Sequence, residues 1–405
     1  MQRQQYNLST PEFNQVMQGD EIKPLNIVKC KYSFNNIETT YQVVRYNKDM
    51  LYVEHSYGIY RSVVINSLNE VVCFAPPKSL STEKFIELNP CKTENIVAEE
   101  FVEGTMINVF WDNVLNDWNI STRNSVGGDV YFFKTELGKT FKTMFYEALH
   151  KANLDLHNLN KSYCYSFVLQ HPDNRIVVPV KTPSLYLVKV YEIVKENEEW
   201  IVKVISLYDI RYQSHWYSTT VKFPEIYKNW INYSDLEEKY ASRNTEYNVM
   251  GVVITNLNTN DRCKFRNPIY EEVRHLRGNQ PKLQYHYLTL RKNGKISEYL
   301  KYYPESKKEF SRFRDQLHLF TNTLYSNYIS CYIKKEKPLG DFNGQFKTHM
   351  FNIHKLYIDE LKAQQKYVTN TVVINYVNAL HESQQMHALH YHLKKRFVDT
   401  VKSEL

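Results

Sequence analysis

The feature that most constrains the fold is a change in hydrophobic periodicity near residue 300 of a 405-residue chain. Before this point, short apolar runs alternate with turn residues, a pattern typical of antiparallel strands. After it, apolar residues recur at helical spacing, beginning at Pro304, a residue favoured in the first turn of a helix. We therefore predict an α+β fold in which a strand-rich domain precedes an all-helical C-terminal domain.

The same periodicities predict individual elements. Strands are expected at 40–46, 50–65, 105–111 and 174–180, and in a hairpin of 184–194 and 199–210. Helices are expected at 136–152, 304–333, 346–365 and 369–397. In the first helix Phe141, Met144, Phe145 and Leu149 share one face, which indicates core packing.

Composition and charge restrict the class of protein. A net charge of +7 permits nucleic acid binding without requiring it. The 33 tyrosines and 20 phenylalanines fit either A+T-rich codon usage or aromatic stacking on bases. Six scattered cysteines indicate free thiols in a reducing compartment, and no apolar window is long enough to span a membrane. We expect a soluble, cytoplasmic protein.

Several ordered segments carry a family resemblance. They are EEFVEGTMINVFWD (99–112), WNISTRNSVGG (118–128), SFVLQHPDNRIVVP (166–179), NVMGVVI (248–254) and RCKFRNPIY (262–270). In this order they resemble the motifs of RNA ligases related to the phage RNA ligase family, which are covalent nucleotidyltransferases. Continuing through 271–285, the chain is similar to ligase-like proteins of giant DNA viruses of eukaryotes. A viral origin would place it in the host cytoplasm or a viral factory.

The resemblance covers roughly residues 90–300 and implies a domain plan. Residues 91–300 would form the nucleotidyltransferase domain, with an ATP-grasp-like ligase fold. Residues 1–90 would be a strand-rich region that belongs to this domain or packs on it. Residues 301–405 would form the helical domain.

The resemblance also implies which residues should perform the chemistry. In the family a lysine attacks the α-phosphate of ATP, and carboxylates on later strands hold a metal ion. Phe101 occupies the lysine position, and Val168 and Met250 occupy two carboxylate positions. Glu103 stands where an aspartate contacts the ribose, while Lys264 and Arg266 keep the cationic character of the last motif.

The three replacements are consistent with one another, because without the lysine the carboxylates facing it would be buried and unpaired, which costs free energy. We therefore expect a pseudoenzyme with no catalytic residue, no cofactor and no metal. The hypothesis we favour is binding of RNA, or of an RNA 5′ end such as the mRNA cap, in the former nucleotide cleft. The candidate binding residues are Phe101, Glu103, Trp111, Trp118, Arg123, Arg175, Lys264 and Arg266.

Each candidate has a structural alternative. Trp111 and Trp118, like the neighbouring Phe110, suit ordinary strand packing, and Arg175 suits an ion pair. Lys394, Lys395 and Arg396, at the end of the last predicted helix, suit the helix dipole as well as RNA. His387, His390 and His392 do not share one helical face, so a metal site there is not expected.

Two other functions are compatible with the sequence. One is an active RNA ligase or nucleotidyltransferase that uses an unrecognised lysine. The other is a scaffold subunit whose helical domain docks viral protein partners of an RNA-processing, translation or replication complex.

Overall fold

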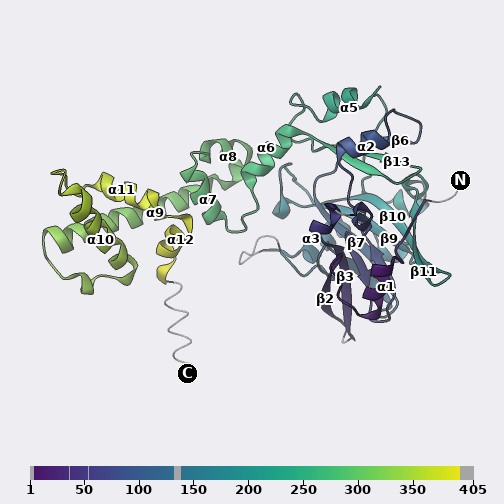
Figure 1. The fold of residues 1–405 in the computed structure, drawn as a ribbon, viewed down its shortest axis with the longest axis horizontal. Helices are drawn as coiled ribbons and strands as arrows, with labels where there is room; N and C mark the ends of the chain where they lie inside the picture. Colours follow the sequence, from purple (N-terminus) through teal and green to yellow (C-terminus); the bar gives the residue numbers. More distant parts are fainter. Residues whose placement is uncertain (1–3, 36, 53, 132–137, 393–405) are drawn as a thin grey trace. The chain divides into compact units, whose positions relative to one another are not determined.

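The computed structural model describes residues 4–35, 37–52, 54–131 and 138–392. The chain divides into two compact units, Met1–Arg277 and Gly278–Leu405. The first is rich in antiparallel strands and the second is helical, which confirms the predicted α+β class (Figure 1). The helices α7 (Leu283–Lys292) and α8 (Ile296–Tyr302) pack within the helical unit, so the division between the units lies at residue 277.

The main sheet of the first unit has six strands in the order β1-β11-β10-β9-β7-β8 among the described residues. Its strands are β1 Gln5–Asn7, β7 Thr105–Asp112, β8 Asp117–Ser121, β9 Tyr163–Gln170, β10 Ser184–Glu196 and β11 Glu199–Ile205. Helix α3 (Phe141–Lys151) covers one face and buries Met144, Phe145 and Ala148 there, as its periodicity predicted. The short helix α4 (Leu207–Arg211) follows β11.

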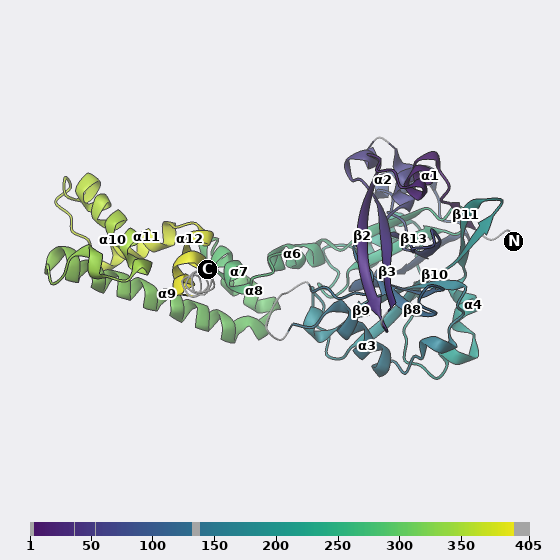
Figure 2. The same ribbon diagram turned by 90° about the horizontal axis from the view of Figure 1, so that it is seen from below.

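A second sheet packs on the other face of the main sheet. Its strands are β2 Leu25–Phe34, β3 Ile37–Tyr46, β4 Val63–Ile65 and β5 Val71–Phe74, preceded by α1 Pro11–Gln18. β2 and β3 run side by side as a long hairpin (Figure 2). Tyr41, Phe110 and Cys164 are fully or almost fully buried in the shared core. The first ninety residues therefore complete the strand-rich unit.

The third sheet has the order β12-β6-β13-β14 in the described part of the chain. Its strands are β6 Ile96–Glu100, β12 Ile226–Tyr227, β13 Gly251–Asn256 and β14 Arg262–Arg266. Helices α2 (Thr82–Leu88) and α5 (Tyr233–Tyr240) bury Phe85 and Leu236 against one face. Helix α6 (Pro268–Arg277) follows β14 directly.

The helical unit is organised around one long helix. Its helices are α7 Leu283–Lys292, α8 Ile296–Tyr302, α9 Lys307–Tyr328, α10 Gly344–Leu356, α11 Asn370–Ala379 and α12 Glu382–Leu389. Helix α9 buries Phe310, Phe313, Leu317, Phe320 and Leu324, so its apolar stripe forms the centre of this core (Figure 2). No helix in the described residues is long and apolar enough to cross a membrane.

Three predicted elements were wrong, and a fourth, the strand at 199–210, ends at Ile205 because the next residues form α4. Residues 50–65 contain two 3₁₀ turns, Asp49–Tyr52 and His55–Ile59, and only a short strand at their end. Residues 369–397 do not form one helix, because His381 caps the start of α12 with its own side chain. Residues 393–397 of that prediction, including the three basic residues, lie outside the described residues.

The third error bears on the site. Residues 174–180 were expected to form a strand, but they are an irregular segment after a 3₁₀ turn at Pro172–Asn174. The backbone N–H groups of Val177 and Val178 donate to the carboxylate of Glu103 rather than to a neighbouring strand. The buried Glu103 side chain therefore accepts the hydrogen bonds that a neighbouring strand would accept in the predicted sheet.

Candidate functional site

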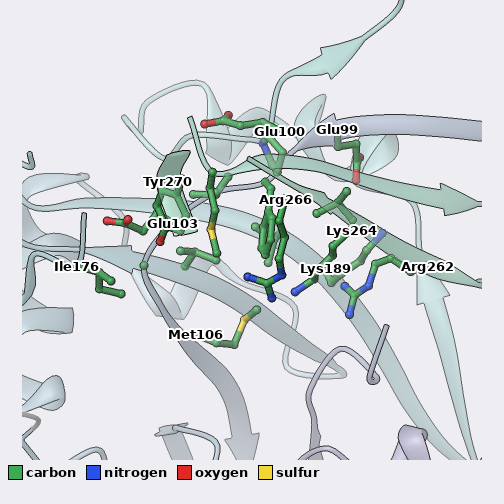
Figure 3. A pocket seen from close by; sticks show the side chains of 18 of the residues that line it. Glu99, Glu100, Glu103, Met106, Ile176, Lys189, Arg262, Lys264, Arg266 and Tyr270 are labelled. Atoms are coloured by element: carbon green, nitrogen blue, oxygen red, sulfur yellow. The ribbon is translucent and has the colours of Figure 1, made fainter. Parts of the chain in front are cut away.

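A cavity of about 290 Å³ lies between the main sheet and the third sheet. β7, β9 and β10 contribute Met106, Val168 and Lys189 from one side, and β6 and β14 contribute Glu100 and Lys264 from the other. Figure 3 labels Met106, Glu100 and Lys264 among the side chains around the cavity, and it shows Lys189, Arg262 and Arg266 directing their nitrogens toward the same region. The segment Phe101–Gly104, which crosses from β6 to β7, also lines the cavity.

Part of the cavity wall is apolar at the positions where the resemblance implies ionised groups. Phe101, Val168 and Met250, the replacements for the lysine and the two carboxylates, all line it. The Phe101 ring lies 4.3 Å from Lys264 Nζ and 5.3 Å from Arg266 Cζ, so cations occupy contacts on this ring. A benzyl group supports these cations but offers no atom for covalent nucleotide transfer.

Cations dominate the electrostatics of the cavity. Arg61, Lys189, Arg262, Lys264 and Arg266 line it. Arg266 pairs with Glu271 at 2.6 Å. Among the described residues, the other four form no ion pair with a carboxylate, so their nitrogen atoms can donate hydrogen bonds to a bound anion.

Among these cations, Lys264 shows the effect of burial and of the neighbouring positive charges most strongly. Burial lowers its pKa to about 6, helped by the positive charges of Arg262, Arg61, Arg266 and Lys78. Burial likewise lowers the pKa of Lys189, and the charge of Glu99 opposes that shift. A phosphate in the cavity would offset the repulsion among these cations.

Glu103 is held by the protein and is only 5% exposed. The N–H groups of Val177 and Val178 donate to its two oxygens at N···O distances of 3.0–3.2 Å. Burial raises its pKa, while the hydroxyl of Tyr270 and the two amides oppose that shift by hydrogen bonding to the carboxylate. Most of its acceptor capacity is thus used within the protein. We infer that Glu103 positions the cavity wall, whereas the resemblance implied a ribose contact.

Gly104 fixes the close approach of the crossing segment to β9. Its φ is +151°, and a Cβ atom built on it would overlap the carbonyl oxygen of Leu169 and the side chain of Val168. Only glycine allows this separation, which brings Glu103 within reach of 177–178.

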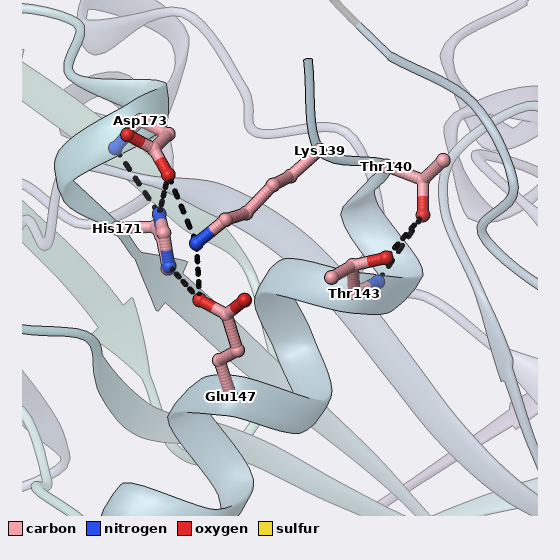
Figure 4. Close-up of polar contacts among 6 residues, drawn as sticks. All are labelled: Lys139, Thr140, Thr143, Glu147, His171 and Asp173. Atoms are coloured by element: carbon pink, nitrogen blue, oxygen red, sulfur yellow. Dashed lines mark hydrogen bonds and ion pairs between the residues drawn. The ribbon is translucent and has the colours of Figure 1, made fainter. Parts of the chain in front are cut away.

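A polar network anchors the segment that binds Glu103 (Figure 4). His171 Nε2 lies 2.9 Å from Glu147 Oε2, and its Nδ1 accepts a hydrogen bond from the backbone N–H of Asp173. Lys139 Nζ contacts Glu147 at 2.7 Å and Asp173 at 3.2 Å. Glu147 belongs to α3, so the network ties the 3₁₀ turn, and the segment after it, to the helix on the main sheet.

Half of the predicted binding residues line the cavity and half do not. Phe101, Glu103, Lys264 and Arg266 line it. Trp118 is buried in the core under α3, and Trp111 packs against that core with Lys161 Nζ 3.6 Å from its ring centroid. Both tryptophans, like the fully buried Phe110, therefore have the strand-packing role that was their structural alternative.

The two remaining predicted cations lie beside the cavity. Arg175 donates from Nε and Nη2 to the carbonyl of Val177, so it shapes the segment that binds Glu103. Arg123 is exposed on the loop after β8, with its guanidinium 5.6 Å from the ring centroid of Tyr46.

Sequence reasoning missed Arg61, Lys189 and Arg262 in the cavity. Arg262 had a detectable signal, since residues 262, 264 and 266 alternate along one strand and share a face. Arg61 and Lys189 had none, because Arg61 lies in the bend before β4 and Lys189 in β10, and both meet β14 only in the tertiary structure.

The residues present do not fit the divalent metal that a nucleotidyltransferase uses. Among the described residues, no group of three or more histidine, cysteine, aspartate or glutamate side chains could hold a metal ion. Glu103, one of the carboxylates in the cavity, is engaged by protein donors. The cation set fits phosphate groups instead.

Comparison with known proteins gives a distant relationship. No protein-family model matches the chain. A stretch of 105 residues, 24% of the chain, is 32% identical to the RNA ligase of Rhodothermus phage RM378. Over this stretch the chain is similar to an RNA ligase. The match covers 23% of the phage protein, so the chain spans about a quarter of this relative's length.

Two solved structures of an archaeal ATP-dependent RNA ligase are also similar. One has 12% identity and a TM-score of 0.39, and the match covers 71% of each chain. The other has 13% identity and a TM-score of 0.38, covering 75% of this chain and 74% of that one. The roles of individual residues therefore rest on the geometry of this chain.

Proposed function

We propose that this RNA ligase-like protein binds the phosphate-bearing 5′ end of an RNA, or a nucleotide, in the cavity without covalent catalysis. The observation that carries the proposal is the set of four cavity cations without carboxylate partners, Arg61, Lys189, Arg262 and Lys264. Cations of this kind form strong hydrogen bonds with phosphate oxygens. The similarity to a phage RNA ligase supports a ligand of the nucleotide class.

The same geometry favours a phosphate over a methylated guanine. A cap reader stacks its positively charged base between aromatic rings. Here Trp111 and Trp118 pack in or against the core, and the Phe101 ring is in contact with two cations. A cationic base would meet like charges in this cavity, so we propose that the phosphates provide most of the affinity.

Fluorescence anisotropy with one short RNA bearing different 5′ ends tests this proposal. We expect the tightest binding for a 5′ triphosphate, weaker binding for a monophosphate and a 7-methylguanosine cap, and the weakest for a hydroxyl. Lys264→Met should remove most of this preference. Equal, weak binding of all four ends would contradict the proposal and favour a scaffold role.

One observation favours a second candidate, a working nucleotidyltransferase. Lys264 lines the cavity, and its lowered pKa leaves the amine largely neutral at pH 7, as a nucleophile requires. Against it, two positions that carry carboxylates in the family are Val168 and Met250.

Incubation with α-³²P-labelled ATP or GTP separates the two candidates. We expect no radiolabel on the denatured protein, and none on Phe101→Lys either, since the carboxylates that would hold a metal ion are missing. Stable label on the wild-type protein that disappears in Lys264→Met would support the enzyme and contradict non-covalent binding.

The proposal also predicts a pH dependence. The Lys264 amine, with its pKa of about 6, is mostly neutral at pH 8 and gains a proton when an anion binds beside it. We therefore expect RNA affinity to rise as the pH falls from 8.5 to 6, and to level off below 6. Calorimetry at pH 8 in buffers of different ionisation enthalpy should show proton uptake on binding. Lys264→Met should abolish the uptake; an unchanged uptake in this variant would assign it to another group.

A further inference from the structure

Cations continue from the cavity onto the surface of the strand-rich unit. Arg61 lines the cavity, while Lys78 and Arg123 are exposed and Arg45 is partly exposed. We call these four residues the cation track. Arg45, Arg61 and Lys78 come from the strands and loops of the second sheet, outside the motifs that carry the family resemblance. Arg123 comes from the loop after β8, within one of these motifs.

Contacts between the segments that carry these residues place the track members near one another. The backbone N–H of Tyr46, next to Arg45, donates to the carbonyl of Tyr60, next to Arg61, and the hydroxyl of Ser62 donates to the carbonyl of Thr122, next to Arg123. The charges also act on one another. Burial lowers the pKa of Lys78, and so do the charges of Arg61, Arg266, Arg262 and Arg123. Arg45 is likewise affected first by burial and next by Arg123. Lys78 also lines a small second cavity together with Lys189 and Arg262. Each track residue is therefore close to the next, and Lys78 links the exposed members to the cavity.

Protein contacts hold the outer members in place without neutralising them. Arg45 donates from Nη1 to the side-chain oxygen of Asn124 at 2.6 Å, and its buried Nε has no partner in the described structure. Arg123 donates from Nη2 to the hydroxyl of Tyr46 at 3.4 Å. Amide and phenol groups orient these guanidiniums, and their full positive charge is retained.

We propose that the track binds the first nucleotides of a single-stranded RNA whose 5′ phosphates occupy the cavity. This inference rests on the proposed function, because it takes the cavity as the position of the RNA end. A series of neighbouring cations that leads to a cation-lined cavity suits a flexible polyanion entering by its terminus. Tyr46, beneath Arg123, is only 6% exposed, so it offers no stacking surface to a base. Recognition along the track is therefore through phosphates and independent of sequence.

The test compares ATP with a ten-nucleotide RNA of mixed sequence carrying a 5′ triphosphate. We expect the RNA to bind wild-type protein at least tenfold more tightly than ATP at low salt. Arg123→Gln and Lys78→Gln should each weaken RNA binding about three- to tenfold and reduce the salt slope by about 0.7. Arg123→Gln should leave ATP affinity unchanged, whereas Lys78→Gln serves only the RNA comparison, because Lys78 also acts on the pKa of Lys264. A scrambled RNA sequence should bind equally well.

Lys29→Gln is the matched control. Lys29 is exposed on the same hairpin, but it pairs with Gln42 and so projects from the opposite face to Arg45. This variant should bind RNA like the wild type. If Arg123→Gln and Lys29→Gln behave alike, or if RNA binds no better than ATP, the track is not an RNA surface. DNA of the same sequence binding more tightly than RNA would overturn RNA as the partner.

These outcomes separate the track from the cavity. If neither ATP nor RNA binds, the proposed function fails and the track fails with it. If ATP binds and depends on Lys264, while the track variants leave RNA affinity unchanged, only the track is contradicted.

Discussion

Glu103→Ala is expected to reduce the free energy of unfolding by about 3–6 kcal/mol, because it leaves two backbone amides and one hydroxyl without their acceptor in a buried site. Each unsatisfied buried donor costs about 1–3 kcal/mol. The amides of Val177 and Val178 cannot find a substitute in a strand ladder, since their segment does not belong to one. Denaturation by urea, followed by intrinsic fluorescence, measures the loss.

Glu94→Gln provides the control for this prediction. Glu94 is exposed just before β6, and its carboxylate accepts no hydrogen bond in the described part of the chain. We expect its replacement to change stability by less than about 0.5 kcal/mol, as is usual for exposed positions away from such contacts. A loss below 1 kcal/mol in Glu103→Ala would show that the two amides find other acceptors or water.

Replacing cavity cations is expected to have two opposite effects: RNA affinity falls, while the stability of the free protein rises. Lys264→Met combined with Arg262→Gln should weaken binding of a 5′-triphosphate RNA roughly a hundredfold or more, since hydrogen bonds to charged groups contribute about 1.5–3 kcal/mol each. Lys264→Met alone should also stabilise the free protein, by about 1–3 kcal/mol at pH 7. Methionine fills a similar volume and removes a crowded amine.

The sign of the stability change follows from the pKa of Lys264. Folding lowers this pKa to about 6 from its usual value of 10.5, so between these limits the unfolded state binds a proton that the folded state does not. Wild-type stability should therefore rise with pH from 7 to 9, and Lys264→Met should show a weaker rise. Reduced stability of this variant together with reduced RNA binding would indicate damage to the fold instead.

The sequence predicted the fold well where one local pattern determines an element. β7, β10 and β11 follow from alternating apolar residues, and α3 and α9 follow from helical spacing. The prediction was wrong at 174–180, where an apolar run reads as a strand although a distant carboxylate takes its amides. Local patterns carry no information about such a partner.

The candidate site was predictable only where it coincides with a motif. Phe101, Lys264 and Arg266 lie at motif positions, and the cavity contains all three. Trp111 and Trp118 were chosen for their chemistry, yet one strand position decides whether a side chain faces a cavity or a core. Arg61 reaches the cavity from the bend before β4 and Lys189 from β10, so only the tertiary structure brings them to Lys264.

The short crossing from β6 to β7 limits how the two sheets around the cavity can move. It consists of Phe101–Gly104, and four residues span at most about 14 Å when fully extended. Within this crossing, the carboxylate of Glu103 accepts hydrogen bonds from the backbone N–H groups of Val177 and Val178. The sheets therefore cannot be drawn apart at this edge. Phe101 lies on the crossing itself, so under the proposed function its ring would help to enclose a ligand at a position fixed by both sheets.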